Sequence, residues 1–297
     1  MTARRVAALF LVLLAGSACG GAGEPKQSAV AGSPGRLIEV NGLHLYFECF
    51  GSGAPTVLLE AGYGVDHHSW DEIERAVGKT TRTCAYDRAG LGLSSVETPK
   101  RRGPFDQLDD LDDLLTSADI DPPYVVVGHS YGGILAWFFV RRHRDDVDGL
   151  LLLDAAHPQQ VKRFRAAFPA RSQTTVVSPE NVDVEKAAAA VGDPGSLEQT
   201  RLIVMTAGKH AAADLSERLA YRARRIWREL QDDYAARSSD SIHVIASDSP
   251  HFIQSNLGQP QLVVQAIREL VSAARADRPL RPCRHVFRPP GALCVGD

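Results

Sequence analysis

The sequence lacks long blocks of charge of one sign: 33 Lys and Arg residues balance 36 Asp and Glu residues in a chain of 297. Proteins that bind nucleic acid usually carry a clustered basic stretch, so we expect no nucleic-acid partner. With 44% hydrophobic residues and a near-neutral net charge, the chain can bury one sizeable core. A single α/β domain accounts for its length.

The adjacent histidines of the sequence also lack partners at the spacing of metal ligands. Asp66, His67 and His68 are adjacent, but neighbouring residues on one strand or helix point apart, and no Cys or carboxylate cluster stands nearby at ligand spacing. The segment leads into a predicted amphipathic helix over about residues 70–77. We therefore expect no metal site here, and these three side chains are predicted to line the rim of a cleft.

The N-terminus lacks an apolar run long enough to cross a bilayer as a helix. Its run Val6–Leu14 follows two arginines and has the length of the hydrophobic region of a signal peptide. The small residues directly before Cys19 resemble the lipobox of bacterial lipoproteins, although Gly16 stands where that pattern prefers leucine. The resemblance implies that residues 1–18 are cleaved and that Cys19 carries lipid.

The expected location follows from this N-terminus. A lipid on Cys19 anchors the exported protein to the outer face of a bacterial cell membrane, whereas an ordinary secretory signal cut after Ala18 produces a secreted protein. Residues 19–35 are rich in Gly, Ala, Ser and Pro and have no periodicity. They are predicted to form a flexible tether between the anchor and the folded domain.

One serine stands between two glycines where a predicted strand meets a predicted helix. Tyr124–Val127 is a short β-branched run, which favours a buried strand, and Ile134–Val140 is apolar on every side, which favours a buried helix. In the Gly-x-Ser-x-Gly turn between them, a Cβ two residues before or after Ser130 would collide with the neighbouring strand or helix. The turn presents the Ser130 hydroxyl to a cleft. It also aims the backbone N–H of Tyr131 at an oxygen that becomes negative when the hydroxyl attacks a carbonyl.

Four segments resemble the α/β-hydrolase superfamily, and the likeness extends over about residues 37–278. They are Leu58–Gly64, Tyr86–Ser94, the turn around Ser130, and Ser249–His251. Strands that alternate with helices predict a mainly parallel sheet covered on both faces. The resemblance implies an α/β-hydrolase fold with an eight-stranded sheet flanked by helices over residues 36–278. It also implies a small cap over about residues 157–200 and leaves a C-terminal tail at 279–297.

Ser130 needs a base, because a serine hydroxyl is a poor nucleophile until its proton is removed. His251 follows the last predicted strand, Ile242–Ala246, by a short loop, which delivers it to the sheet edge where Ser130 lies. His129 is predicted to point away along the turn. Both His129 and His157 are expected to line the cleft or to pack in hydrogen-bonded positions.

The acid that orients His251 has two candidates. Asp154 ends the strand predicted at Val147–Leu153, a location that some members of the superfamily use for this residue. Asp214 follows the next strand, as in many members, but it precedes Leu215-Ser216-Glu217 and so resembles a helix N-cap with a capping-box glutamate. We favour Asp154, because the role needs only a carboxylate within reach of the far imidazole nitrogen.

Four cysteines remain after Cys19, and an exported chain meets an oxidising compartment. Cys283 and Cys294 share a tail rich in Pro and Arg, where a disulfide would hold a segment short of core contacts. Cys49 and Cys84 then form the other pair, since the resemblance implies that their strands are neighbours. Two buried free thiols are the alternative for Cys49 and Cys84.

The resemblance implies a serine hydrolase without metal or organic cofactor. Ser130, Asp154 and His251 form its triad, and the backbone N–H of Tyr63 joins that of Tyr131 in the oxyanion hole. The predicted substrate is a small molecule with a carboxylic ester or related acyl bond.

Several alternatives stay open. Aminopeptidase, acyltransferase and cofactor-free peroxidase chemistry use the same triad, and a binding protein can keep the fold without turnover. Dehalogenases and epoxide hydrolases of the superfamily carry Asp in place of Ser130, which disfavours their chemistry. The sequence leaves the acyl group, the alcohol and the oligomeric state open.

Overall fold

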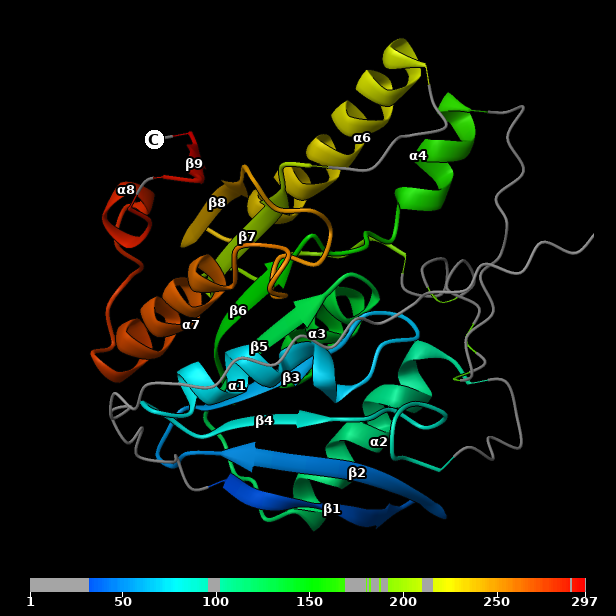
Figure 1. Ribbon diagram of the computed structural model, residues 1–297, viewed down its shortest axis with the longest axis vertical. Coiled ribbons are helices and arrows are strands. Elements are labelled where there is room, and N and C mark those ends of the chain that lie inside the picture. The colour runs from blue at the N-terminus through cyan, green and yellow to red at the C-terminus, as the bar shows by residue number, and fades with distance from the viewer. Residues whose placement is uncertain are drawn as a thin grey trace, which may run out of the picture.

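Nine strands form one sheet, in the order β1-β2-β4-β3-β5-β6-β7-β8-β9 (Figure 1). The computed structural model describes residues 32–95, 102–168, 180, 182, 187, 192–209, 216–288 and 290–296. The six strands β3 to β8 run parallel, β2 and β9 pair antiparallel with the two outermost of them, and β1 pairs antiparallel with β2. The predicted mainly parallel sheet is confirmed. The strands are β1 (Gly32–Val40), β2 (Leu43–Phe50), β3 (Thr56–Glu60), β4 (Thr83–Tyr86), β5 (Tyr124–His129), β6 (Val147–Leu153), β7 (Arg201–Ala207), β8 (Ser241–Ala246) and β9 (Ala292–Val295).

Helices cover both faces of the sheet (Figure 1). The first face carries α1 (Asp71–Val77), α7 (Pro260–Arg275) and α8 (Cys283–Val286), and the second carries α2 (Pro104–Ser117), α3 (Tyr131–Arg142) and α6 (Glu217–Ala235). Successive strand residues point to opposite faces. Val126 therefore belongs to the hydrophobic cluster with α3, while Val125 and Val127 belong to the cluster with α7. Burial on both faces explains why the central strands are apolar throughout.

The chain enters the sheet through the hairpin of β1 and β2. Val40 pairs with Leu43 across a two-residue loop, and both loop residues, Asn41 and Gly42, have positive φ, at 53° and 76°. Two-residue hairpin loops require such left-handed residues, which Asn and Gly adopt readily. The Asn-Gly pair thus accounts for the hairpin from local sequence, and β1 begins at Gly32, inside the range predicted as tether.

The residues that follow α7 form part of the folded domain. β9 pairs antiparallel with β8, and Cys283, Val286 and Phe287 are buried in the hydrophobic cluster on the α7 face. The prediction of eight strands followed by a tail at 279–297 was therefore wrong, because this segment contributes the ninth strand. β9 is a short edge strand whose residues alternate between half-buried and exposed, so its sequence carries no strong strand pattern.

Both predicted disulfides are present. Cys49–Cys84 joins directly paired residues of β2 and β4, and Cys283–Cys294 joins α8 to β9. The alternative of two free thiols at Cys49 and Cys84 is therefore wrong. The second disulfide ties the C-terminal segment to the sheet, and restricting the unfolded chain in this way stabilises the fold.

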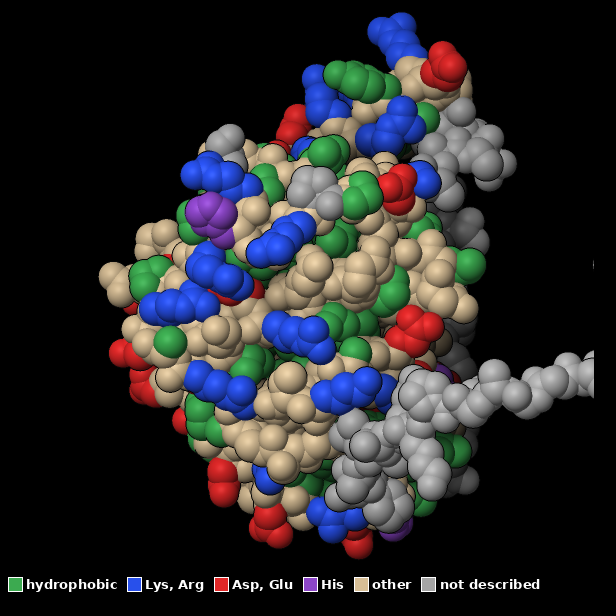
Figure 2. All heavy atoms as spheres, turned by 60° about the vertical axis from the view of Figure 1, so that its left-hand side comes forward, with side chains coloured by type: hydrophobic (Ala, Val, Ile, Leu, Met, Phe, Trp, Pro, Cys, Tyr) green, Lys and Arg blue, Asp and Glu red, His purple; other side chains and the backbone are tan. Residues whose placement is uncertain are grey.

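The predicted cap is described in part. Its helix α4 (Gln160–Ala167) has no buried residue and packs beside α6, and the two project from one end of the molecule (Figure 1). Residues 169–179 lie outside the described residues, and so do residues 1–31 with the predicted signal peptide and Cys19. No helix in the described part of the chain has the length and apolar character needed to span a membrane. Figure 2 shows Lys and Arg side chains spread over one face among polar and hydrophobic ones.

Candidate active site

Ser130 lies on the turn between β5 and α3, at φ 53° and ψ −120°. A residue with a side chain seldom has positive φ, and such strain persists only where the surrounding structure enforces it. A Cβ at Gly128 would come within 2.7 Å of Ala136 Cβ, and a Cβ at Gly132 within 2.4 Å of the carbonyl oxygen of Ala61. The steric reason for the two glycines is therefore confirmed, and the tight packing holds Ser130 in its strained conformation.

His251 and Asp154 meet at the carboxyl edge of the parallel strands. Asp154 follows β6 and is fully buried, and its Oδ2 lies 2.7 Å from Nδ1 of His251, which follows β8. Its other oxygen, Oδ1, accepts hydrogen bonds from Trp227 Nε1 at 2.7 Å and from the backbone N–H of Ala207 at 3.1 Å. Because carboxylate oxygens only accept, Nδ1 of His251 is the donor in this contact, and Nε2 is the acceptor nitrogen of the corresponding neutral tautomer.

Two features of helix α6 were not predicted. Trp227 reaches Asp154 from α6, and the sequence offers no signal for this contact, because a Trp on an amphipathic helix usually packs in the core. Helix α6 begins at Glu217 with Ser216 as its N-cap residue, so the prediction of Asp214 as the N-cap was wrong. Asp214 itself lies outside the described residues.

His129 packs against His251, which corrects the prediction that it points away along the turn. The two rings lie 4.7 Å apart, and His129 Nε2 donates to the carbonyl oxygen of His251 at 3.0 Å. Burial, followed by the charge of His251, lowers the pKa of His129 to about 3. His129 is therefore neutral near pH 7 and supports the backbone of His251, so it does not compete as a base.

The other histidines singled out by the sequence bind carboxylates elsewhere. His157 is buried with its Nε2 3.0 Å from Asp233, in keeping with hydrogen-bonded packing. His67 was predicted to line a cleft rim, but it is 2% exposed and its Nδ1 lies 2.9 Å from both oxygens of Asp87. Long-range pairing with the loop after β4 draws this ring inward, whereas the side chain of His68 stays 66% exposed.

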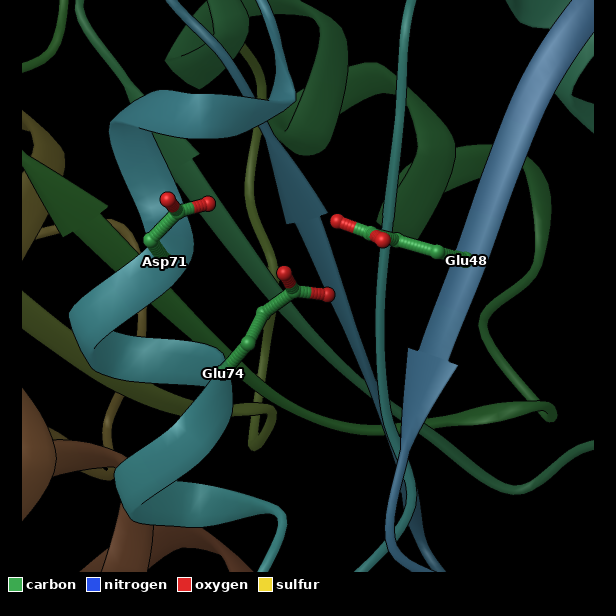
Figure 3. Close-up of side chains that lie close together, drawn as sticks. All are labelled: Glu48, Asp71 and Glu74. Atoms are coloured by element: carbon green, nitrogen blue, oxygen red, sulfur yellow. The ribbon is translucent and has the colours of Figure 1, made fainter. Parts of the chain in front are cut away.

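Three carboxyl groups meet between α1 and β2, beside His67 (Figure 3). Oxygens of Glu48, Asp71 and Glu74 lie within 4.8 Å of one another, and Glu48 and Glu74 point toward each other. Glu74 is fully buried, and neither of its oxygens has a hydrogen bond of good geometry among the described residues. Burial, followed by the charge of Glu48, raises the pKa of Glu74 to about 10. This cluster has no local sequence signal, because β2 and α1 are brought together only by folding.

Glu74→Gln is expected to stabilise the protein in alkaline solution. Unfolded Glu74 ionises near a pKa of 4.5, whereas folded Glu74 keeps its proton up to a pKa of about 10. The native protein therefore loses stability as the pH rises between these values, by up to ~1.4 kcal/mol per pH unit. Urea unfolding should show a gain for the variant that is larger at about pH 8 than at about pH 5. Asp71→Asn, at a half-exposed position, is the control with little expected change.

A destabilised Glu74→Gln variant at alkaline pH would contradict this assignment of the proton. Carboxylate oxygens are also ligands for divalent cations, and a cation held by the same cluster would require Glu74 to lose its proton. In that case the neutral glutamine would weaken the fold.

Comparisons with known proteins concern the fold that carries these residues. A family model described as alpha/beta hydrolase fold matches residues 55–187. The protein YqjL of Bacillus subtilis is 36% identical over 106 residues, which cover 36% of this chain and 42% of that protein. Epoxide hydrolase 3 of Xenopus tropicalis is 33% identical over 120 residues, which cover 39% of this chain and 32% of that protein. The chain thus spans less than half the length of these relatives.

Solved structures match over more of the chain. A thermophilic esterase from Thermogutta terrifontis has a TM-score of 0.62 at 20% identity, over 82% of this chain and 99% of that one. An esterase from Exiguobacterium antarcticum has a TM-score of 0.58 at 14% identity, over 80% of this chain and 100% of that one. At these identities the likeness concerns the fold alone. Together with the family model, these matches show that the chain has the α/β-hydrolase fold.

Proposed function

We propose that the chain is a serine hydrolase that cleaves a carboxylic ester or related acyl bond of a small molecule through an acyl-enzyme on Ser130. The observation that carries the proposal is the 2.7 Å contact between His251 Nδ1 and Asp154 Oδ2. This contact leaves Nε2 of His251 available as a base, at the sheet edge where Ser130 follows β5. Nucleophile, base and orienting acid are the three roles that acyl transfer on a serine needs.

The proposed reaction has two halves. His251 Nε2 takes the Ser130 proton as Oγ bonds to the acyl carbon, and the backbone N–H groups of Tyr63 and Tyr131 stabilise the negative carbonyl oxygen. The bond to the leaving alkoxide breaks, and the imidazolium, stabilised by Asp154, gives that alkoxide its proton. Water then attacks the acyl-enzyme by the same steps, which releases the carboxylic acid and restores Ser130.

Some relatives are named for epoxides or haloalkanes. A serine nucleophile favours acyl substrates over both of these classes. Attack of a hydroxyl on an epoxide or haloalkane carbon forms an ether, which the same base and a water molecule do not cleave. Attack on an acyl group forms an ester, which they do cleave. The carboxylate of Asp154 already accepts hydrogen bonds from His251, Trp227 and Ala207, so it is held as an orienting group.

The native full-length protein tests the proposal directly. A fluorophosphonate probe should label it once, at Ser130, as mass spectrometry of the labelled peptide would show. p-Nitrophenyl esters of graded chain length should be hydrolysed, with a burst of p-nitrophenol wherever deacylation is slow. A folded protein that is neither labelled nor active would instead support the binding-protein alternative.

We further propose that the protein is exported and anchored by lipid on Cys19. The signal-like N-terminus supports this location, as do the two disulfides, because disulfides persist in oxidising compartments. Cys19→Ala, made in the full chain and expressed in a bacterial host, should move the protein from the membrane fraction and the detergent phase to the aqueous phase. If the variant stays equally membrane-bound, the lipid anchor is wrong.

A further inference from the structure

Arg88 lies in the loop after β4, buried beneath the segment that follows β3. Its five N–H groups are all engaged. Nε donates to Glu180 Oε2 at 2.8 Å, and Nη1 donates to Glu60 Oε1 at 2.5 Å and to the carbonyl oxygen of Ala61 at 2.7 Å. Nη2 donates to the carbonyl oxygen of Gly62 at 2.7 Å and to Glu180 Oε1 at 3.3 Å. We call Glu60, Arg88 and Glu180 the Arg88 clamp.

The clamp sets the direction of the predicted oxyanion amide. The carbonyl of Gly62 and the N–H of Tyr63 belong to one planar trans peptide unit, so they point in opposite directions. Once Arg88 binds the Gly62 oxygen, the Tyr63 N–H must point away from Arg88. Gly62 itself lies beside the nucleophile, because a Cβ added to it would be 3.4 Å from Ser130 Cβ.

Glu180 secures the same loop from the cap. This fully buried carboxylate accepts the backbone N–H of Gly64 at 2.7 Å in addition to its bonds with Arg88. Glu180 thus binds the backbone on one side of Tyr63, at Gly64, and Arg88 binds it on the other side, at Gly62.

The clamp also reaches the second predicted oxyanion residue. Gln107 Nε2 donates to Glu180 Oε2 at 3.2 Å, and Gln107 Oε1 accepts the Tyr131 hydroxyl proton at 2.7 Å. The Arg88 guanidinium lies 5.6 Å from the centre of the Tyr131 ring. The Arg88 clamp therefore links the segment of Tyr63 to that of Tyr131, the two segments that the proposed reaction uses.

Electrostatics argue for a positional role. Removing charges from water is costly, so buried ion pairs are seldom retained for stability alone, and an incomplete pair is worse than none. Burial by itself would lower the pKa of Arg88, but its pairs with Glu180 and Glu60 raise that pKa above the ordinary value, so Arg88 stays charged.

We propose that Arg88 and Glu180 are positioning residues of the oxyanion hole, with Glu180 supplied by the predicted cap. This inference rests on the proposed acyl-transfer function. The clamp acts through the backbone on either side of Tyr63 and through the side chain of Tyr131, so its loss should weaken binding of the transition state more than binding of the substrate.

Glu180→Gln tests the clamp in the full-length protein. Glutamine keeps the size of the side chain but lacks the charge and one of the two acceptors. We expect kcat for a p-nitrophenyl ester to fall by about 10- to 100-fold, somewhat less than the loss of a whole oxyanion donor, with KM within about twofold. The inhibition constant of a boronic acid, whose serine adduct is tetrahedral, should rise by a similar factor.

Glu269→Gln is the matched control. Glu269 on α7 is 1% exposed and pairs with Arg278 and Arg281, which follow that helix, so its replacement also removes a buried carboxylate from two arginine ion pairs. It should leave kcat and the boronic acid constant near native values. If Glu180→Gln does not fold, Glu180→Asp keeps the charge, but its shorter side chain cannot span Arg88 and Gly64, and the same loss of kcat is expected.

Three results overturn the inference. The first is a native kcat in folded Glu180→Gln or Glu180→Asp, and the second is a rise in KM alone, which would make Glu180 a substrate-binding residue. The third is an equal loss of kcat in Glu269→Gln, which would assign the effect to stability. If the native protein is neither labelled nor active, the proposed function fails and the inference falls with it. If only the Glu180 result fails, the proposed function stands.

Discussion

Ser130→Ala is expected to lower kcat for p-nitrophenyl esters by about 10⁶-fold, the size of loss that follows removal of the nucleophile from a serine triad. Alanine cannot form the acyl-enzyme, so the remaining rate comes from direct attack of water near the oxyanion hole. Alanine has the same Cβ at φ 53°, so the fold should be retained. Initial rates and circular dichroism measure both effects, and fluorophosphonate labelling should disappear.

Replacing a second serine, Ser238, tests whether the loss of kcat is specific to Ser130 or follows the loss of any serine hydroxyl. The Ser238 hydroxyl donates to the carbonyl of Thr200, in a contact between the start of β7 and the residues before β8. Ser238→Ala should therefore keep nearly native turnover. Should Ser130→Ala keep a substantial part of the native rate, the hydrolysis would belong to another group and the proposed acyl-enzyme would be wrong.

Asp154→Asn is expected to lower kcat by about 10⁴-fold without unfolding the protein. Asp154 Oδ1 accepts from Trp227 and Ala207, and Oδ2 faces His251. Asparagine has one acceptor oxygen, which the two donors at the Oδ1 position retain, so its NH₂ group must face His251. The imidazole then accepts at Nδ1 and carries its proton on Nε2, where it cannot act as the base.

Asp214→Asn is the comparison for this variant. Asp154 already holds the His251 ring, so the change at Asp214 should leave esterase rates almost native. Circular dichroism of both variants confirms folding. A collapse of activity in Asp214→Asn with near-normal rates in Asp154→Asn would show that the acid follows β7 and not β6.

Local sequence predicted the elements whose signals lie within a few neighbouring residues. The left-handed loop at Asn41 and Gly42 follows from steric preference, and the turn around Ser130 follows from the lack of room for a Cβ beside it. The parallel sheet followed from apolar runs that alternate with helices. The pairing of Asp154 with His251 was expected because parallel strands end at the same edge of the sheet; its part in catalysis stays a prediction.

Long-range contacts were less accessible, because they leave no periodic pattern. β9 has no hydrophobic face of its own and becomes a strand by pairing with β8. Nothing near His67 indicated that Asp87 would draw it inward. Similarly, no local feature of Trp227 indicated that its indole N–H would bind Asp154.

By itself the sequence determined the mainly parallel sheet, the sharp turn at Ser130 and the strand ends that carry Asp154 and His251, because each depends on local sterics or on strand and helix periodicity; the α/β-hydrolase fold was implied by resemblance. Only the tertiary structure decided what surrounds them. It joined Arg88 to Glu180 beneath the loop of Tyr63, and Glu48 to Glu74 between β2 and α1. Ionisable groups from distant segments meet there, where their partners and burial set their protonation and leave them little freedom to move.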